Sequence, residues 1–192
     1  MRLDNHKGYD SVMTVATVNT GEPMSIQSIG RQFYQDVAHL LMRPGSFYAA
    51  LPTGKNQADK LIFLGLTALV YSVMVGFFTA APRPMIMVLY AMNALLMPVV
   101  TALVLHLLLR VVYPGRYTYG LLLGVTAYAN VVLLLAWIPG LAPWAELLKY
   151  GLIGLGLVKT GGISGLKAFL AVAATGVVLV MMVYWLQYVM RF

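Results

Sequence analysis

Cysteine is absent from this sequence, and charged residues are scarce. Without thiols the chain can form no disulfide, thiolate nucleophile, zinc–thiolate site or iron–sulfur cluster. Only 10% of its residues are charged, whereas a soluble domain has about 25%. The sequence is 60% hydrophobic, with a mean hydropathy of +0.81. This composition is typical of an integral membrane protein with several membrane-spanning helices.

Acidic residues are also few, and most of them precede the first long apolar run: Asp4, Asp10, Glu22, Asp36 and Asp59. Only Glu146 follows it, so the formal net charge of +7 lies mainly in the apolar half of the chain. Basic residues beside apolar segments set membrane topology. We therefore expect these charges to orient the protein in a lipid bilayer, and we expect no nucleic-acid partner. The N-terminal residues do not have the pattern of a cleavable signal peptide.

Long uncharged runs dominate the rest. The run Met85–Leu109 has no formal charge and, as a helix, would reach roughly 37 Å, enough to cross a hydrocarbon core of about 30 Å. We predict five spans: Leu61–Ala81, Met85–Leu109, Gly120–Ile138, Ala145–Val158 and Ala168–Met190. The fourth is short and contains Glu146 and Lys149, so it is either a span or a re-entrant segment. We prefer a span, because with five spans the basic residues near the membrane boundaries lie mostly on one side of the membrane.

That orientation follows from the basic residues near the predicted membrane boundaries. One side carries Arg31, Arg43, Lys55, Lys60, Arg110, Arg116, Lys159 and Lys167. The other side carries Arg83, Lys149 and Arg191. Because basic residues accumulate on the cytoplasmic side, we predict a cytoplasmic N-terminus and a C-terminus outside, in a prokaryotic inner membrane.

The region before the first span has two predicted parts. Residues 1–24 are polar and are expected to form a flexible cytoplasmic tail. Residues 25–59 form an interfacial segment, in which 25–42 show apolar residues at helical spacing and predict an amphipathic helix. This helix would lie in the membrane interface, dock a partner, or pack on the protein's own bundle. The candidate contacts for a partner or for anionic lipid are Ile29, Arg31, Phe33, Arg43, Phe47 and Tyr48.

No motif of a hydrolase, a metalloprotease, a nucleotide-binding protein or a dithiol redox enzyme occurs in the sequence. The few carboxylates are too scattered to work as a catalytic pair. The 12 methionines do not form repeated copper-binding patterns with histidine, and methionine commonly fills gaps between helices. We therefore predict a protein that is not an enzyme and that has no metal or cofactor.

Polar residues inside the predicted spans are the remaining candidates. Asn93, Pro98, Tyr128, Asn130 and His106 could form a polar centre between the second and third spans. A buried amide in hydrocarbon is costly when unpaired. Asn93 and Asn130 would therefore either line a polar path or form an interhelical hydrogen bond that holds the bundle. Glu146 and Lys149, three residues apart, could form an ion pair on the outer surface.

The order of several short motifs resembles that of the Yip1 domain family. These motifs are Arg43-Pro44 with Phe47-Tyr48, then Gly115-Arg116-Tyr117, then Thr126–Ala129, a Pro-Gly turn, and Ile163–Ala168. The resemblance covers the chain from about Arg43 to its C-terminus, so residues 60–192 would be a five-span Yip1-like membrane domain with a cytoplasmic N-terminus. Eukaryotic members of that family engage prenylated Rab GTPases and act in vesicle formation. The short N-terminal region of this chain is more similar to compact prokaryotic members.

Together these observations predict an all-α integral membrane protein, a bundle of five transmembrane helices with an N-terminal amphipathic interfacial helix. We expect a scaffold or adaptor in membrane organisation or trafficking, or an accessory membrane subunit, that forms homo-oligomers or joins a membrane complex. The alternative is a small oligomeric permease or channel with a polar path near the second and third spans.

Overall fold

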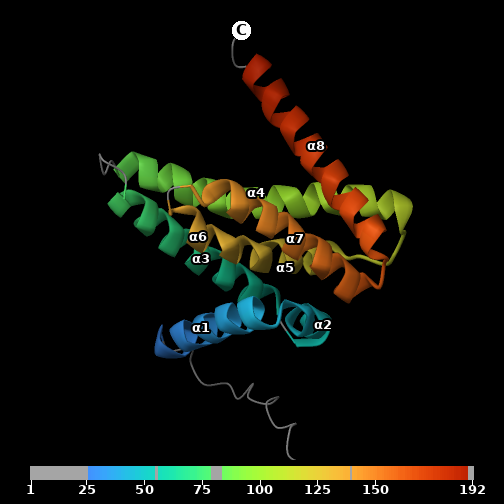
Figure 1. The fold of residues 1–192 in the computed structure, drawn as a ribbon, viewed down its shortest axis with the longest axis horizontal. Helices are drawn as coiled ribbons and strands as arrows, with labels where there is room; N and C mark the ends of the chain where they lie inside the picture. Colours follow the sequence, from blue (N-terminus) through green and yellow to red (C-terminus); the bar gives the residue numbers. More distant parts are fainter. Residues whose placement is uncertain (1–25, 55, 79–83, 139, 190–192) are drawn as a thin grey trace, which may run out of the picture.

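The computed structural model describes residues 26–54, 56–78, 84–138 and 140–189. These residues are almost entirely helical, with no strand among them, which confirms the predicted all-α class (Figure 1). The helices are α1 Ile26–Met42, α2 Pro44–Gly54, α3 Gln57–Phe78, α4 Pro84–Val112, α5 Tyr119–Ala129, the 3-10 helix η1 Asn130–Val132, α6 Leu133–Ala136, α7 Ala142–Gly161 and α8 Gly165–Val189. The predicted tail, residues 1–24, lies outside the described residues.

Four helical segments in this part of the chain are long and apolar enough to cross a membrane. They are α3, α4, the continuous stretch Tyr119–Ala136 and α8, and they correspond to the first, second, third and fifth predicted spans. Helix α7 corresponds to the fourth and has 20 residues, where about fifteen were expected. Its three charged residues distinguish it from those four segments.

Helix α5 forms the centre of the bundle. Its residues Leu122–Ala129 are all buried, and α2, α3, α4 and α7 contact it from different sides. A helix with apolar residues on every face is stable only when other elements or lipid surround it. The long apolar run of this segment is therefore explained by packing within the protein.

The connections between the helices alternate between the two ends of the bundle. The α4–α5 and α7–α8 connections lie at one end, and the α6–α7 connection lies at the other (Figure 1). Arg110 ends the charge-free part of α4, Arg116 lies in the α4–α5 connection, and Lys159 and Lys167 flank the α7–α8 connection. Four basic residues thus gather near one end of the bundle.

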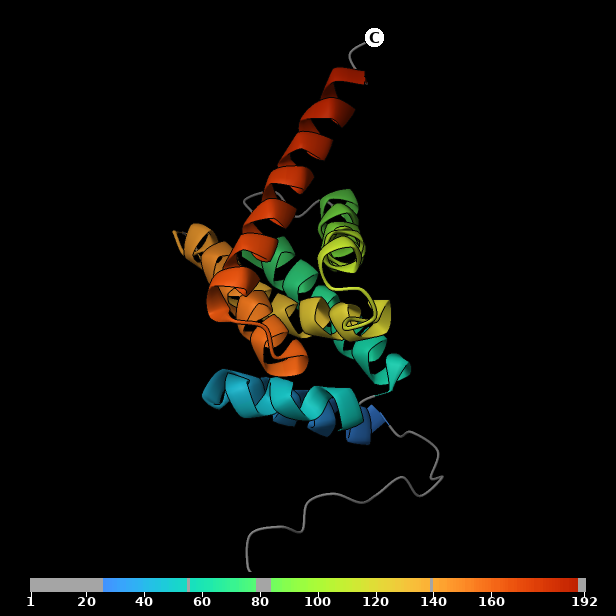
Figure 2. The ribbon, with the colours of Figure 1, turned by 90° about the vertical axis from the view of Figure 1, so that its right-hand side faces the viewer.

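Helix α2 lies beside α1 at one side of the bundle, with its axis across that of α1, and packs on α7 and α5 (Figure 2). Phe47 and Tyr48 are 5% and 0% exposed, and the Tyr48 hydroxyl donates a hydrogen bond to the Val125 carbonyl of α5 over 3.4 Å. Gly156 of α7 makes this approach possible, because a Cβ there would collide with Val125 and press on Tyr48. The structure places Phe47 and Tyr48 inside the protein, where they cannot serve as the lipid or partner contacts expected from the sequence.

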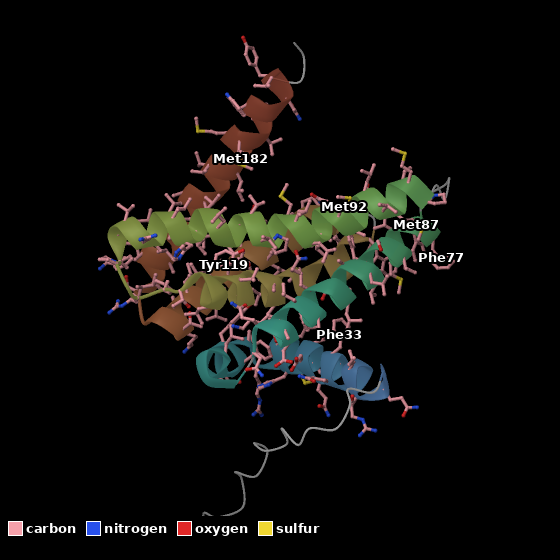
Figure 3. All side chains as sticks on the ribbon, turned by 180° about the vertical axis from the view of Figure 1, so that it is seen from behind. Phe33, Phe77, Met87, Met92, Tyr119 and Met182 are labelled. Atoms are coloured by element: carbon pink, nitrogen blue, oxygen red, sulfur yellow. The ribbon has the colours of Figure 1, made fainter. Side chains whose placement is uncertain are left out.

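Helix α8 crosses the bundle and projects beyond it (Figures 1 and 2). Its first half packs on α4 and α7, whereas Met181, Tyr184 and Trp185 in its second half are each at least 65% exposed. Met182 lies on the projecting part, on the opposite side of α4 from Phe33 (Figure 3). This divergence of α8 from α7 opens the space that forms the candidate site.

Candidate functional site

A polar recess of about 510 Å³ lies between α4, α7 and α8 and reaches η1. Apolar side chains such as Met97 and Val183 supply part of its wall. Its polar lining comes from Asn93, Thr101, Asn130, Glu146, Lys149, Tyr150, Tyr184 and Gln187. A polar hollow between apolar helices is uncommon enough to mark a candidate site, since polar groups are expensive in hydrocarbon.

The floor of the recess depends on Pro98 inside α4. Proline has no amide hydrogen, so it cannot donate to the carbonyl four residues earlier in its helix, which here belongs to Ala94. The side-chain amide of Asn130 donates to that same carbonyl over 3.0 Å. Asn130 is 2% exposed and Ala94 is 1% exposed. The asparagine therefore replaces a helix hydrogen bond that proline removes.

Thr126 makes a second contact of the same kind, one turn before Asn130. Its hydroxyl lies 3.0 Å from the Pro98 carbonyl of α4, and also 3.1 Å from the Leu122 carbonyl of its own helix. Two polar side chains on one face of the central segment thus bond to two backbone carbonyls, one turn apart, on α4. These contacts fix α4 against α5 and η1 beneath the recess.

Glu146 and Lys149 provide the charges of the recess. The Lys149 ammonium lies 2.5 Å from a carboxylate oxygen of Glu146, and their side chains are 18% and 47% exposed. The ion pair expected from their spacing is present. Both residues line the recess, and Lys149 also borders a cavity of about 10 Å³ next to Pro98, Thr126 and Asn130.

The structure brings together only part of the predicted polar centre. Asn93, which lies about two turns before Thr101 on α4, lines the recess with Asn130. The hydrogen bond of Asn130, however, is to the backbone carbonyl of Ala94. Pro98 is buried beside them. The interhelical hydrogen bond considered from the sequence is thus present, with a backbone carbonyl as acceptor.

Tyr128 and His106 lie elsewhere. The Tyr128 ring is 4.8 Å from the Phe47 ring and 4.5 Å from the Phe63 ring, between centroids. Its hydroxyl is buried without a hydrogen-bond partner among the described residues, as is Nδ1 of His106. The His106 ring faces the Tyr119 ring at 6.2 Å. Neither residue lines the recess.

Sequence reasoning did not connect Glu146, Lys149, Tyr184 and Gln187 with the two asparagines. The ion pair could be recognised from its spacing in one helix. The packing of α8 on α4 could not be predicted, because α8 is apolar on nearly every face and its sequence does not specify which face packs. One signal in the sequence could have indicated the packed face of α8. Two polar residues, Tyr184 and Gln187, lie three positions apart near the end of its apolar run.

The remaining N-terminal candidates are Ile29, Arg31 and Phe33 on α1 and Arg43 between α1 and α2. Phe33 packs its ring 5.1 Å from that of Phe63 on α3, and Ile29 is half-buried. Arg31 and Arg43 are exposed, and Arg31 lines a shallow polar hollow on α1. Two basic side chains therefore remain available at this surface.

The recess contains one charged group of each sign, Glu146 and Lys149. The carboxylate of Glu146 forms an ion pair with the ammonium of Lys149. The described residues contain no cluster of three His, Asp or Glu side chains that could hold a metal ion.

Two buried tyrosines lie outside the candidate spans and outside the recess. Burial raises the pKa of the Tyr48 and Tyr117 hydroxyls. Both therefore stay protonated, and each donates to a buried carbonyl, Tyr117 to that of Leu157 over 3.0 Å.

Comparison of the chain with models of protein families, with curated proteins and with solved structures found no match. The similarity to the Yip1 domain family therefore remains a prediction based on short motifs. Within the fold, the aromatic residues of those motifs are packing residues: Phe47, Tyr48, Tyr117 and Tyr128 are all buried. These four side chains pack within the bundle and do not line the recess.

Proposed function

We propose that this chain is a five-span membrane protein of Yip1-like type that works without enzymatic activity, as a scaffold or accessory subunit that associates with copies of itself. Helix α7 is the fourth of the five spans in this proposal and is added to the four candidate segments α3, α4, Tyr119–Ala136 and α8. Its 20 residues correspond to about 30 Å of helix, the thickness of a hydrocarbon core. Its lysine–glutamate pair is neutral overall and faces the recess, which lowers the cost of two charges within a span.

The proposed orientation places the basic end of the bundle in the cytoplasm. The α4–α5 and α7–α8 connections share that end (Figure 1), and the residues Arg110, Arg116, Lys159 and Lys167 supply the positive charge. With five spans the C-terminus is outside. Reporter fusions at the two ends should therefore give opposite compartments, and reporters in the same compartment would contradict the five-span layout.

The observation that carries the proposed self-association is the exposed outer half of α8. Of the four candidate spans, α8 has the smallest buried share, and its outer half presents methionine and large aromatic side chains. The other three candidate spans each have a larger buried share. Side-chain packing drives helix association in lipid, so a projecting span with large, adaptable side chains suits contact with the same span of a second copy.

Engineered cysteines provide a direct test, because the native chain has none. A single Met181→Cys variant should form a disulfide-linked dimer when membranes are oxidised mildly. Leu103→Cys, on an exposed position of α4, is the matched control and should form much less. Equal cross-linking of the two variants, or a monomer in single-molecule photobleaching, would contradict self-association through α8.

Exposed Arg31 and Arg43 extend the proposal to the cytoplasmic side, where they would attract anionic lipid or an acidic partner surface. Replacing both with Gln should weaken retention of anionic lipid or partner during purification in mild detergent. The same yield and the same co-purified material as in the wild type would remove this part of the proposal.

A small oligomeric permease is the second candidate, and the recess is the observation that favours it. Toward the basic end, the cavity beside Pro98 and Thr126 measures about 10 Å³, at the lower limit of the volume that holds one water molecule. The hollow therefore ends within the bundle in this conformation, which favours a scaffold. Solute flux into liposomes that Asn93→Leu and Asn130→Leu both abolish would support the permease instead.

A further inference from the structure

The polar recess continues into a second, apolar hollow. This apolar groove measures about 610 Å³ and lies between α7 and α8. Tyr150 and Gly176 line both hollows, so the two meet at these residues. Because they adjoin, the recess and the groove can act as one elongated site with a polar part and an apolar part.

One face of α8 runs along both parts. Residues of α8 that line the groove are Gly165, Phe169, Val172, Ala173 and Gly176. Those that line the recess are Gly176, Leu179, Val180, Val183, Tyr184 and Gln187. Successive members are one to four positions apart and keep to helical spacing, which places them on one side of the helix. The site is therefore continuous along about 33 Å of α8 by helical rise.

Glycines keep the groove open. Gly151 and Gly154 of α7 and Gly165 and Gly176 of α8 line it, and a Cβ added at any of these four positions would meet no atom within 4 Å. Glycine lowers helix stability relative to alanine, and no close helix approach explains it at these positions. The space that these residues leave has the apolar lining that suits a hydrocarbon chain, since Leu155, Val158 and Phe169 form part of its wall.

The recess has the opposite chemistry and carries both signs of charge. Lys149 has three N–H donors and Glu146 has several acceptor positions on its carboxylate, so their mutual contact leaves capacity on both. Asn93 and Gln187 add amide donors and acceptors. A ligand group with a phosphate near Lys149 and an ammonium near Glu146 would satisfy both charges at once, whereas a purely anionic group would meet the Glu146 carboxylate.

We propose that the recess and the groove together bind one zwitterionic phospholipid, its headgroup beside Glu146 and Lys149 and one acyl chain between α7 and α8. Charge complementarity selects the headgroup, and the continuity of the two hollows at Tyr150 and Gly176 connects it to the chain.

The proposed layout also gives the lipid an orientation. Glu146 lies near the start of α7 and Gln187 near the end of α8, and both of these ends face outside in a five-span protein with a cytoplasmic N-terminus. The headgroup part is then near the outer boundary and the groove runs inward from it, as for a lipid of the outer leaflet. This assignment of the leaflet rests on the proposed function, whereas the binding site itself does not.

Native mass spectrometry of the full chain in mild detergent tests the proposal. Phosphatidylethanolamine and phosphatidylglycerol with identical acyl chains are the probes, and free phosphoethanolamine tests the headgroup alone. We expect one phosphatidylethanolamine per chain, bound about tenfold or more tightly than phosphatidylglycerol, a difference of the size that one lost charge contact produces. Free phosphoethanolamine should bind far more weakly than the lipid, because it leaves the groove empty.

Two kinds of variant separate the parts of the site. Gly154→Leu fills the groove without a collision at its Cβ and should lower lipid affinity about tenfold or more. Gly65→Leu, at an equally open glycine of α3 that lines neither hollow, is the control and should bind as the wild type does. Glu146→Gln with Lys149→Gln should remove most of the preference for the zwitterionic headgroup while binding through the chain persists.

Several results would overturn the proposal. Unchanged lipid affinity in Gly154→Leu would show that the groove is not used, as would equal binding of free phosphoethanolamine and the lipid. A preference for phosphatidylglycerol in the wild type would refute the zwitterionic assignment. Helix content by circular dichroism and elution volume verify folding, and if Gly154→Leu fails to fold, Gly151→Leu at the neighbouring open position is the replacement. Cross-linking of Met181→Cys measures self-association and does not depend on lipid binding. The proposed function and the lipid site can therefore each fail while the other holds.

Discussion

The side-chain amide of Asn130 donates a hydrogen bond to the Ala94 carbonyl over 3.0 Å. This carbonyl is the one whose helix donor is missing because residue 98 is proline. The asparagine and the proline are 32 positions apart in the sequence, and the bond joins them into one unit. A proline in a spanning helix is tolerated when a neighbouring helix satisfies the freed backbone group, and Asn130 does so at the base of the recess.

The first prediction concerns this unit. Asn130→Leu should lower the free energy of unfolding by about 1–2 kcal/mol, because it leaves a buried carbonyl without its donor. Adding Pro98→Ala returns an amide hydrogen to α4, so the double variant should regain much of the loss. A double-mutant cycle by steric trapping in bicelles measures the coupling.

The control for this cycle is Asn93→Leu, five residues earlier on α4 and exposed, which should change stability by much less. Additive effects of the two substitutions at 98 and 130 would mean that the asparagine does not compensate for the proline.

Glycines of α7 give a second prediction, in which one substitution has opposite effects at two positions. A Cβ at Gly161 would collide with the Tyr117 side chain, which donates a hydrogen bond to the Leu157 carbonyl. Gly161→Ala should therefore lower the free energy of unfolding by about 1–3 kcal/mol through overpacking. Gly151→Ala has open space around its Cβ and should be neutral or stabilise by up to about 1 kcal/mol, because alanine favours helix.

Thermal unfolding of both alanine variants in the same detergent provides the comparison. If Gly161→Ala were as stable as Gly151→Ala, the close contact between Tyr117 and α7 would not exist in solution.

The Tyr128 hydroxyl gives a third prediction. It is buried with no hydrogen-bond partner among the described residues, and a buried unpaired hydroxyl costs free energy. Tyr128→Phe keeps the ring between Phe47 and Phe63 and should leave the free energy of unfolding unchanged or raise it by up to about 1 kcal/mol. Tyr48→Phe, which removes a donor to the Val125 carbonyl, should instead lower it. A clear loss of stability in Tyr128→Phe would show that this hydroxyl has a partner, such as a bound water.

Much of the fold could be predicted from the sequence, because hydrophobic run length is a strong signal in a membrane protein. The expected bounds of the first three spans and of the last agree with α3, α4, Tyr119–Ala136 and α8 to within a few residues. The packing of these helices could not be predicted in the same way. A helix that is apolar on every face has no periodicity that marks its buried side. The central position of α5 and the projection of α8 therefore could not be predicted from the sequence.

The candidate site, like the fold, could be predicted from the sequence only in part. The sequence singled out Asn93, Asn130, Glu146 and Lys149 as separate pairs, and all four line one recess. The acceptor of Asn130 was missed because it is a backbone carbonyl, which no side-chain pattern reveals. Phe47 and Tyr48 were assigned to lipid or partner contact because aromatic residues beside a span often occupy the interface. Their burial depends on Gly156, more than 100 positions later in the sequence, so it could not be inferred locally.

The last prediction decides how α1 is held, a question that its amphipathic pattern left open. Phe33 packs its ring against Phe63 of α3 at 5.1 Å, and Leu40 is fully buried. If these contacts hold α1, Phe33→Ala should cost about 1–2 kcal/mol of local stability through lost burial and the aromatic contact, and hydrogen exchange at α1 amides should become roughly 5–30 times faster. The adjacent Tyr34 is 74% exposed, so Tyr34→Ala is the matched control and should leave exchange nearly unchanged. If instead α1 is held by the membrane interface or by a partner, Phe33→Ala will have little effect in detergent relative to the wild type, and exchange in both proteins will slow when they are returned to bilayers.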